Sequence, residues 1–226
     1  MRSYRQYCAA AKALDVIGDR WNLLIVRELL LRVACRYVDL LDGLPGIATN
    51  LLAERLRDLE QAGIVYREDA PPPIATTLYR LTPRGEALRA TMLELIRWGA
   101  ELMEDPGDDD VFRSHWLAAP VRLYLEDQAP DQPKVAIELR AGNQEPFTIQ
   151  AEGGHITNRP GSAEQADLIL DGSPRLILGV LTGRLQADEA EALGLRLQGD
   201  VTTLRRVQRS PGEVELADSE AAATRR

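Results

Sequence analysis

Hydrophobic residues in the first sixty positions recur at helical spacing. The pattern predicts helices over residues 7–17, 19–32, 37–44 and 49–62. Gly18 separates the first two, and Asp19 is the expected N-cap of the second. In the fourth, Leu52, Leu56 and Leu59 fall at i, i+4 and i+7, so they face a core and leave the opposite face to solvent.

After Gly63 the hydrophobic period changes from 3.6 to 2, which predicts strands over residues 64–68 and 77–81 and therefore a hairpin. Thr82 and Pro83 then start a long helix as N-cap and first helical residue. Its apolar line extends beyond a small core and suggests a dimer seam: Leu88, Met92, Leu95, Gly99 and Leu102. Helices followed by a hairpin and a return helix form a winged helix-turn-helix, which presents its fourth helix to the DNA major groove.

The second half of the chain reads as a sheet with a few helices. Strands are expected over residues 135–139, 147–151, 155–157, 166–170 and 195–198, and helices over residues 174–183, 187–193 and 200–209. An antiparallel sheet with helices to one side is an α+β domain, so the expected fold class of the whole chain is α+β.

One acidic stretch with Pro106 and Gly107, running from Glu104 to Asp110, divides the two halves. We expect a DNA-binding and dimerisation domain over residues 1–104, a second domain over residues 111–210 and a flexible tail over residues 211–226.

Composition adds constraints on the compartment and the partner. The 226 residues contain no run of eighteen uncharged apolar positions and no signal-peptide layout, so we expect a soluble, cytoplasmic protein without a membrane partner. The net charge of -8 argues at first against nucleic acid. Residues 1–100, however, carry 14 Lys and Arg against 12 Asp and Glu, so the acidic excess belongs to the second half.

An ordered set of motifs spans residues 5–100 and resembles the HxlR-type branch of winged-helix regulators. The matching residues run from Tyr7-Cys8 through Ala13–Trp21, Arg36–Leu40, Leu44–Ile47, Arg55–Glu60, Gly63–Val65 and Tyr79–Gly85 to Trp98-Gly99. The resemblance implies a homodimer that reads a two-fold-symmetric operator in double-stranded DNA through the 49–62 helix.

Carried over residue by residue, the resemblance places Thr49, Asn50 and Ala53 where the recognition helix meets bases. It places Arg36, Arg55 and Arg57 where phosphate or base contact is possible. In the sequence, Arg67 and Arg80 flank the wing. A solvated helix face is the alternative for each arginine. Two features depart from the family: Ala48 replaces a hydroxyl residue, and the wing tip from Ile74 to Thr77 has no basic residue.

The two cysteines fit neither a disulfide framework nor a zinc site. In relatives, a cysteine at the place of Cys8 can sense electrophiles or oxidants, and a helix N-terminus favours the thiolate. A small core residue is the alternative for Cys8. Cys35 is expected to be structural.

Residues 167–207 resemble the sterol-carrier-protein type of lipid-binding domain. The motifs are Asp167–Pro174, Leu181–Leu185, Ala192–Gly194 and Leu197–Asp200. The resemblance implies an apolar tunnel between sheet and helices, and hence a small apolar ligand. Candidate lining residues, which would be plain core in a domain without a cavity, are Trp116, Phe147, Ile149, Leu176, Ile177, Val180 and Leu181.

Other function classes find less support. His115 and His155 are the only histidines and lack metal-ligand spacing, and no phosphate loop, nucleophile elbow or dinucleotide fingerprint occurs, so we expect no enzyme, metal or cofactor. The remaining alternative is a carrier of hydrophobic compounds whose winged helix contacts protein rather than DNA.

Overall fold

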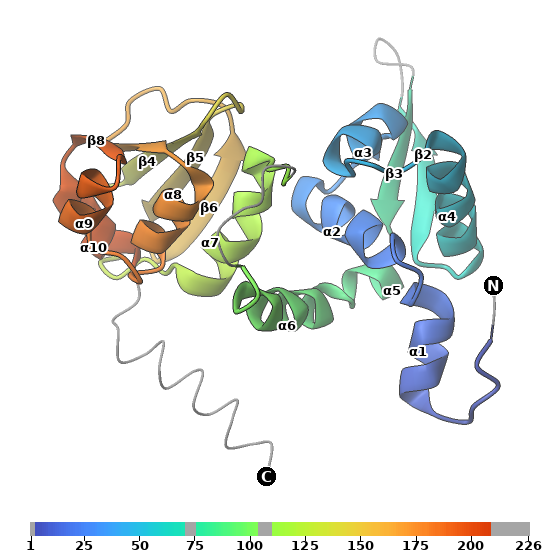
Figure 1. Cartoon of the computed structure of the whole chain (residues 1–226). Coiled ribbons are helices and arrows are strands. Elements are labelled where there is room, and N and C mark those ends of the chain that lie inside the picture. Colours follow the sequence, from blue (N-terminus) through green and yellow to red (C-terminus); the bar gives the residue numbers. More distant parts are fainter. Residues whose placement is uncertain (1–2, 71–75, 104–109, 209–226) are drawn as a thin grey trace. The chain divides into compact units, whose positions relative to one another are not determined.

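The computed structural model of the chain describes residues 3–70, 76–103 and 110–208 and divides it into two compact units, Met1–Glu104 and Asp105–Arg226 (Figure 1). Each unit is considered by itself. No helix within the described ranges is both long and apolar enough to cross a membrane.

The first unit combines helices with a small antiparallel sheet. The helices are α1 (Ala9–Ile17), α2 (Asn22–Arg32), α3 (Tyr37–Gly43), α4 (Thr49–Gln61), α5 (Pro83–Glu86) and α6 (Arg89–Ala100). The strands are β1 (Cys35–Arg36), β2 (Val65–Asp69) and β3 (Thr77–Leu81), in the order β1-β3-β2. The periodicity predicted the hairpin of β2 and β3, whereas β1 is too short to leave a pattern.

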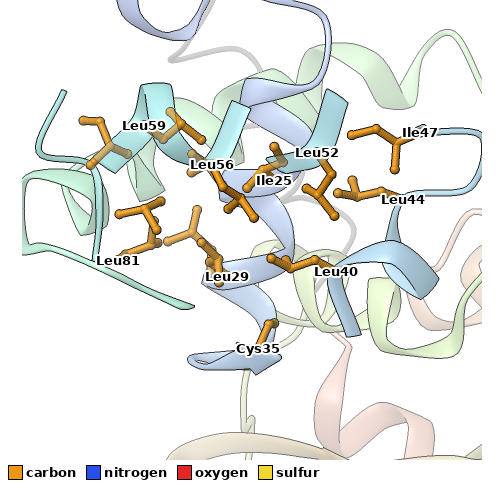
Figure 2. Close-up of a cluster of buried hydrophobic side chains, with 14 of the residues drawn as sticks. Ile25, Leu29, Cys35, Leu40, Leu44, Ile47, Leu52, Leu56, Leu59 and Leu81 are labelled. Atoms are coloured by element: carbon orange, nitrogen blue, oxygen red, sulfur yellow. The ribbon is translucent and has the colours of Figure 1, made fainter. Parts of the chain in front are cut away.

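The core of the first unit lies between α2, α3, α4 and the sheet. Leu52, Leu56 and Leu59 of α4 are at most 2% exposed and point toward Ile25 and Leu29 of α2 (Figure 2). Their predicted burial is confirmed, and it fixes which face of α4 remains outside.

Two predicted boundaries in the first unit are wrong. Asp19 does not cap α2: the N-cap is Trp21, and the Asp19 carbonyl accepts a 3.0 Å hydrogen bond from the Asn22 N–H in a turn before the helix. The return helix is broken after Glu86, where the Leu88 N–H bonds to the Gly85 carbonyl in a tighter turn. Gly85 lies so close to β2 that an added Cβ would be 2.3 Å from the Ile64 carbonyl oxygen.

The second unit contains a five-stranded sheet. Its strands are β4 (Val135–Ala141), β5 (Phe147–Glu152), β6 (His155–Pro160), β7 (Leu168–Gly172) and β8 (Arg196–Gly199), in the order β6-β5-β4-β7-β8. Its helices are η1 (Ser114–Leu117), α7 (Ala118–Tyr124), α8 (Pro174–Leu181), α9 (Ala187–Ala192), η2 (Val201–Thr203) and α10 (Leu204–Val207).

The expectation of a wholly antiparallel sheet is wrong, because β7 pairs with β4 in parallel. After edge strand β6 the chain crosses to the other side of β4, so that it enters β7 in the direction of β4. Asp167 ends the crossover: its carboxylate accepts a 2.7 Å hydrogen bond from the Ala136 N–H. A pattern of period 2 records which residues share a face, but not which strand lies beside which.

One face of this sheet is apolar. Paired residues Leu139 and Phe147, and Ile137 and Ile149, are fully buried there, and α8 packs on β4 and β7 (Figure 1). The alternation of these strands predicted this face correctly.

Candidate nucleic-acid interface

The outward face of α4 lies opposite its buried leucines. Thr49, Asn50 and Arg57 are exposed and Ala53 is half-buried beside them. Three of these four residues can form polar contacts, and the small Ala53 allows close approach of a large partner. The face predicted from the sequence is therefore present and open within the first unit.

Different contacts fix the first and the last turn of α4. Ala48 at the N-cap provides no side-chain hydrogen bond, but the Tyr37 hydroxyl donates to the Thr49 carbonyl at 2.5 Å and ties α4 to α3. At the other end Gly63 adopts φ +69°, a left-handed conformation that glycine favours, and the Ile64 N–H bonds back to the Leu59 carbonyl.

Arg57 differs from the other arginines predicted to contact DNA. Its Nε donates to the Ala53 carbonyl one turn earlier at 3.2 Å, and within the described part of the chain it forms no ion pair. Its charge is therefore available to an anion such as a phosphate.

The other four predicted arginines are paired with carboxylates. Arg36 bonds Asp39 at 2.9 Å in the capping box of α3, which lowers the pKa of Asp39. Arg67 and Arg80 pair with Glu60 at 2.6 Å and Glu68 at 2.5 Å. Arg55 contacts three carboxylates and is only 13% exposed. The charge of each of these arginines is therefore partly neutralised by a carboxylate of the same chain.

The wing is a regular hairpin where the structure describes it. Val65 pairs with Leu81 and Asp69 with Thr77, and the Thr77 hydroxyl donates to Asp69 at 3.0 Å. Residues 71–75 lie outside the described residues, and with them Ile74 and part of the wing tip predicted to lack basic side chains.

Comparison with known proteins agrees with this architecture. Residues 16–106 match the model of the HxlR-like helix-turn-helix family. The HTH-type transcriptional regulator YodB of Bacillus subtilis is 38% identical over 96 residues, which make up 42% of this chain and 84% of YodB. The chain belongs to the HxlR-like helix-turn-helix family.

A second relative and a solved structure cover a similar share of the chain. The uncharacterized HTH-type transcriptional regulator YvaP of Bacillus subtilis is 34% identical over 93 residues, or 41% of this chain and 85% of YvaP. A solved structure of reduced YodB, covering 46% of this chain and all of its own, shows 35% identity and a TM-score of 0.38. The family match and the identity to YodB confirm the predicted HxlR-type winged helix-turn-helix regulator domain, and the family match ends at residue 106.

The two cysteines of this HxlR-like unit have opposite environments. Cys8 is exposed at the N-cap position of α1, where the backbone N–H groups of Ala11 and then Ala10 lower the pKa of its thiol. Cys35 is buried in the core, and desolvation raises its pKa to about 12. The alternative of Cys8 as a core residue is wrong, and Cys35 is buried as expected.

The candidate ligand residues of the second unit lie mostly in its core. Five of the seven are at most 2% exposed, whereas Trp116 and Leu176 are half-buried: the five are Phe147, Ile149, Ile177, Val180 and Leu181. A cavity of about 430 Å³ lies elsewhere, on the polar face of the sheet, lined by Lys134, Ala136, Gln150, Arg159, Glu164, Gln165 and Asp167. The family match ends at residue 106, so the sterol-carrier-type resemblance stays a prediction.

The two histidines of the second unit differ in their exposure to solvent. His115 is buried in η1 and packs edge-on against Trp116, while His155 is exposed at the start of β6. Among the described residues no group of three or more His, Cys, Asp or Glu side chains could hold a metal ion.

Proposed function

We propose that the protein is a transcription regulator that binds a two-fold-symmetric DNA operator as a homodimer, with α4 of each protomer in the major groove. The observation that carries this function is the outward face of α4, where Thr49, Asn50 and Arg57 are exposed opposite a leucine row fixed in the core. The function includes no catalytic step.

The side chains of this face have chemistry suited to duplex DNA. The Asn50 amide can pair with adenine through one donor and one acceptor, and Ala53 can approach a thymine methyl group. Arg57, one turn further along α4, can reach a phosphate or a guanine. Thr49 lies in the first turn of α4, where its hydroxyl can form a hydrogen bond with a phosphate or with a base.

Exposed apolar side chains on α6 and in the turn after it support a homodimer. Leu95 and Trp98 of α6 and Leu102 of the turn stand at i, i+3 and i+7 and are 42%, 61% and 65% exposed. Of the predicted dimer line, Met92 instead packs into the core of its own unit. An apolar row of this kind is stabilised when a second copy covers it.

A salt titration tests the proposed DNA contact. Fluorescence anisotropy with labelled duplex DNA from upstream of the protein's own gene should show binding that weakens steeply with salt. Arg57→Ala should reduce affinity and lower the logarithmic salt slope by about one, because the variant releases one counterion fewer from the DNA when it binds. Arg196→Ala, which removes an exposed arginine of the second unit, is the matched control and should leave both unchanged.

Either of two results would contradict the assignment. If no duplex binds at any salt concentration, the alternative of a carrier with a protein-binding winged helix gains support. If duplex binds but Arg57→Ala and Arg196→Ala behave alike, α4 is not the reading element.

For the second unit we propose a small apolar ligand between the sheet and α8. The apolar face built from β4, β5 and β7 supports this site, and the resemblance to sterol-carrier-type domains supplies the ligand class. Because the core side chains are closely packed, the ligand would have to displace α8 from the sheet. Coupling to DNA affinity of about 1–3 kcal/mol would then make the two binding events reciprocal.

Native mass spectrometry of the purified full chain tests this second step. Retained apolar small molecules, and a change in their affinity when operator DNA is added, are the expected results. Binding of such molecules with no effect of DNA would leave the ligand site standing and remove the coupling. Complete absence of binding to fatty acids and sterols would remove the site itself.

A further inference from the structure

Arg55 lies in the middle of α4, yet its charge is turned away from the outward face. Its guanidinium pairs with Asp19, Glu54 and Asp58; the contact between Nη1 and the Asp58 carboxylate measures 3.2 Å. The side chain is 13% exposed, and its Nε is buried without a hydrogen-bond partner among the described residues. This guanidinium is therefore enclosed by its own chain.

Asp19 makes this cluster a link between distant parts of the sequence. It lies in the turn between α1 and α2, 36 residues before Arg55. The leucines of α4 fix which face is buried, but apolar contacts are not directional. Ala48 provides no side-chain cap for α4, and the Tyr37 hydroxyl restrains only the backbone of its first turn. The contact between Arg55 and Asp19 adds a directional restraint in the middle of the helix.

The charges of the cluster argue against a direct DNA contact by Arg55. One guanidinium serves three carboxylates. If Arg55 swung out to a phosphate, it would leave those three negative charges unpaired close to the DNA backbone. Two of them, Glu54 and Asp58, are on α4 itself and would approach the DNA with it.

On the premise that α4 reads DNA, we infer that Arg55 is a positioning residue: by binding Asp19 it fixes the orientation of the recognition helix against the α1–α2 turn. The residue acts through α4 and does not itself touch the operator. The HxlR-type resemblance instead implies that Arg55 contacts a phosphate or a base. The contact role and the positioning role predict different effects of substitution.

Asp19→Asn separates these roles by the sign of its effect. Removing a negative charge near a DNA-binding face strengthens DNA binding when only electrostatics matters. If Asp19 positions α4 through Arg55, the same substitution weakens operator binding, by about five- to tenfold, because the binding-competent orientation is less populated. The logarithmic salt slope stays that of the wild type, since no phosphate contact is lost.

Substitutions of Arg55 complete the test. Arg55→Lys keeps the charge but loses the planar fork that reaches several carboxylates, so it should weaken binding at unchanged salt slope. Arg55→Met combined with Asp19→Asn should bind no more weakly than Arg55→Met alone, because both remove one link. A drop of about one in the slope for Arg55→Met, with equal or tighter binding by Asp19→Asn, would overturn the positioning role.

Hydrogen exchange on the DNA-free full chain tests the positioning role of Arg55 independently of DNA binding. Amides of α4 should exchange faster in Asp19→Asn and Arg55→Met than in wild type, while Glu94→Gln, which breaks the Arg97–Glu94 pair on α6, leaves them unchanged. Unchanged exchange in all three variants would overturn the positioning role even if DNA binds. Loss of all duplex binding by wild type would instead sink the proposed function, and the exchange result would still stand.

Discussion

At the scale of single residues, Cys8 and Cys35 show how position sets thiol chemistry. Cys8 is exposed beside free N–H groups at the start of α1, so the pKa of its thiol is lowered, whereas burial raises the pKa of Cys35 to about 12. A thiolate is the reactive form, so only Cys8 is suited to sensing electrophiles.

Iodoacetamide labelling followed by peptide mass spectrometry measures this difference. The labelling rate of Cys8 should rise with pH around a midpoint below the pKa of about 8.5 of an ordinary cysteine, because its thiolate forms earlier. Cys35 should remain unlabelled in the native protein and react in denaturant. A titration of Cys8 at or above the ordinary value, or native labelling of Cys35, would contradict these environments.

Residue types along the chain were enough to select the outward side of α4, because the leucine spacing fixes the opposite side. They were not enough to distinguish the exposed Arg57 from the ion-paired Arg55, which lies two residues earlier on the same helix. The partner of Arg55, Asp19, comes from a turn far earlier in the sequence. Ion pairs of this kind depend on tertiary neighbours that no local pattern records.

At the scale of elements, the buried pair of Asp127 and Arg206 ties the end of the second unit to its start. Arg206 of α10 bonds Asp127 at 2.5 Å and also donates to the Pro133 and Gln132 carbonyls. Asp127 in turn accepts from the Gly154 and Ala129 N–H groups. The Arg206 hydrogen bond is the main cause of the lowered pKa of Asp127.

Asp127→Asn should therefore destabilise the second unit by about 3 kcal/mol, because it leaves a buried guanidinium without its charge partner. Urea unfolding at several pH values measures this loss. Since the pKa of Asp127 is lower in the folded than in the unfolded state, its stabilisation is fully present above about pH 4 and lost as pH falls further. A difference between wild type and variant that persists unchanged well below pH 4 would contradict this origin.

Most elements could be predicted from periodicity, and the misses have physical causes. β1 has only two residues, and α7 with η1 follows an uncapped stretch, so neither leaves a readable pattern. The break between α5 and α6 depends on the close contact of Gly85 with the Ile64 carbonyl. The parallel pairing of β4 with β7 depends on the crossover through Asp167, which is a property of topology.

At the scale of the whole molecule, the expected dimer rests on the exposed row of α6. Trp98→Glu should shift the protein toward a monomer, because a charge placed in an apolar interface must be desolvated without a partner. Sedimentation velocity measures the change, and Leu193→Glu, at the exposed apolar residue that follows α9, serves as control. A wild-type monomer, or a dimer indifferent to Trp98→Glu, would exclude this seam.

The central claim is that α4 of the first unit meets the bases of duplex DNA. A photo-cross-linking amino acid placed at Ala53, used with the full chain and duplex DNA from upstream of its own gene, tests it most directly. The expected result is a cross-link to the bases of one short segment, repeated about one helical turn away for the second protomer. A cross-link to a protein partner only, with the DNA unmodified, would contradict it.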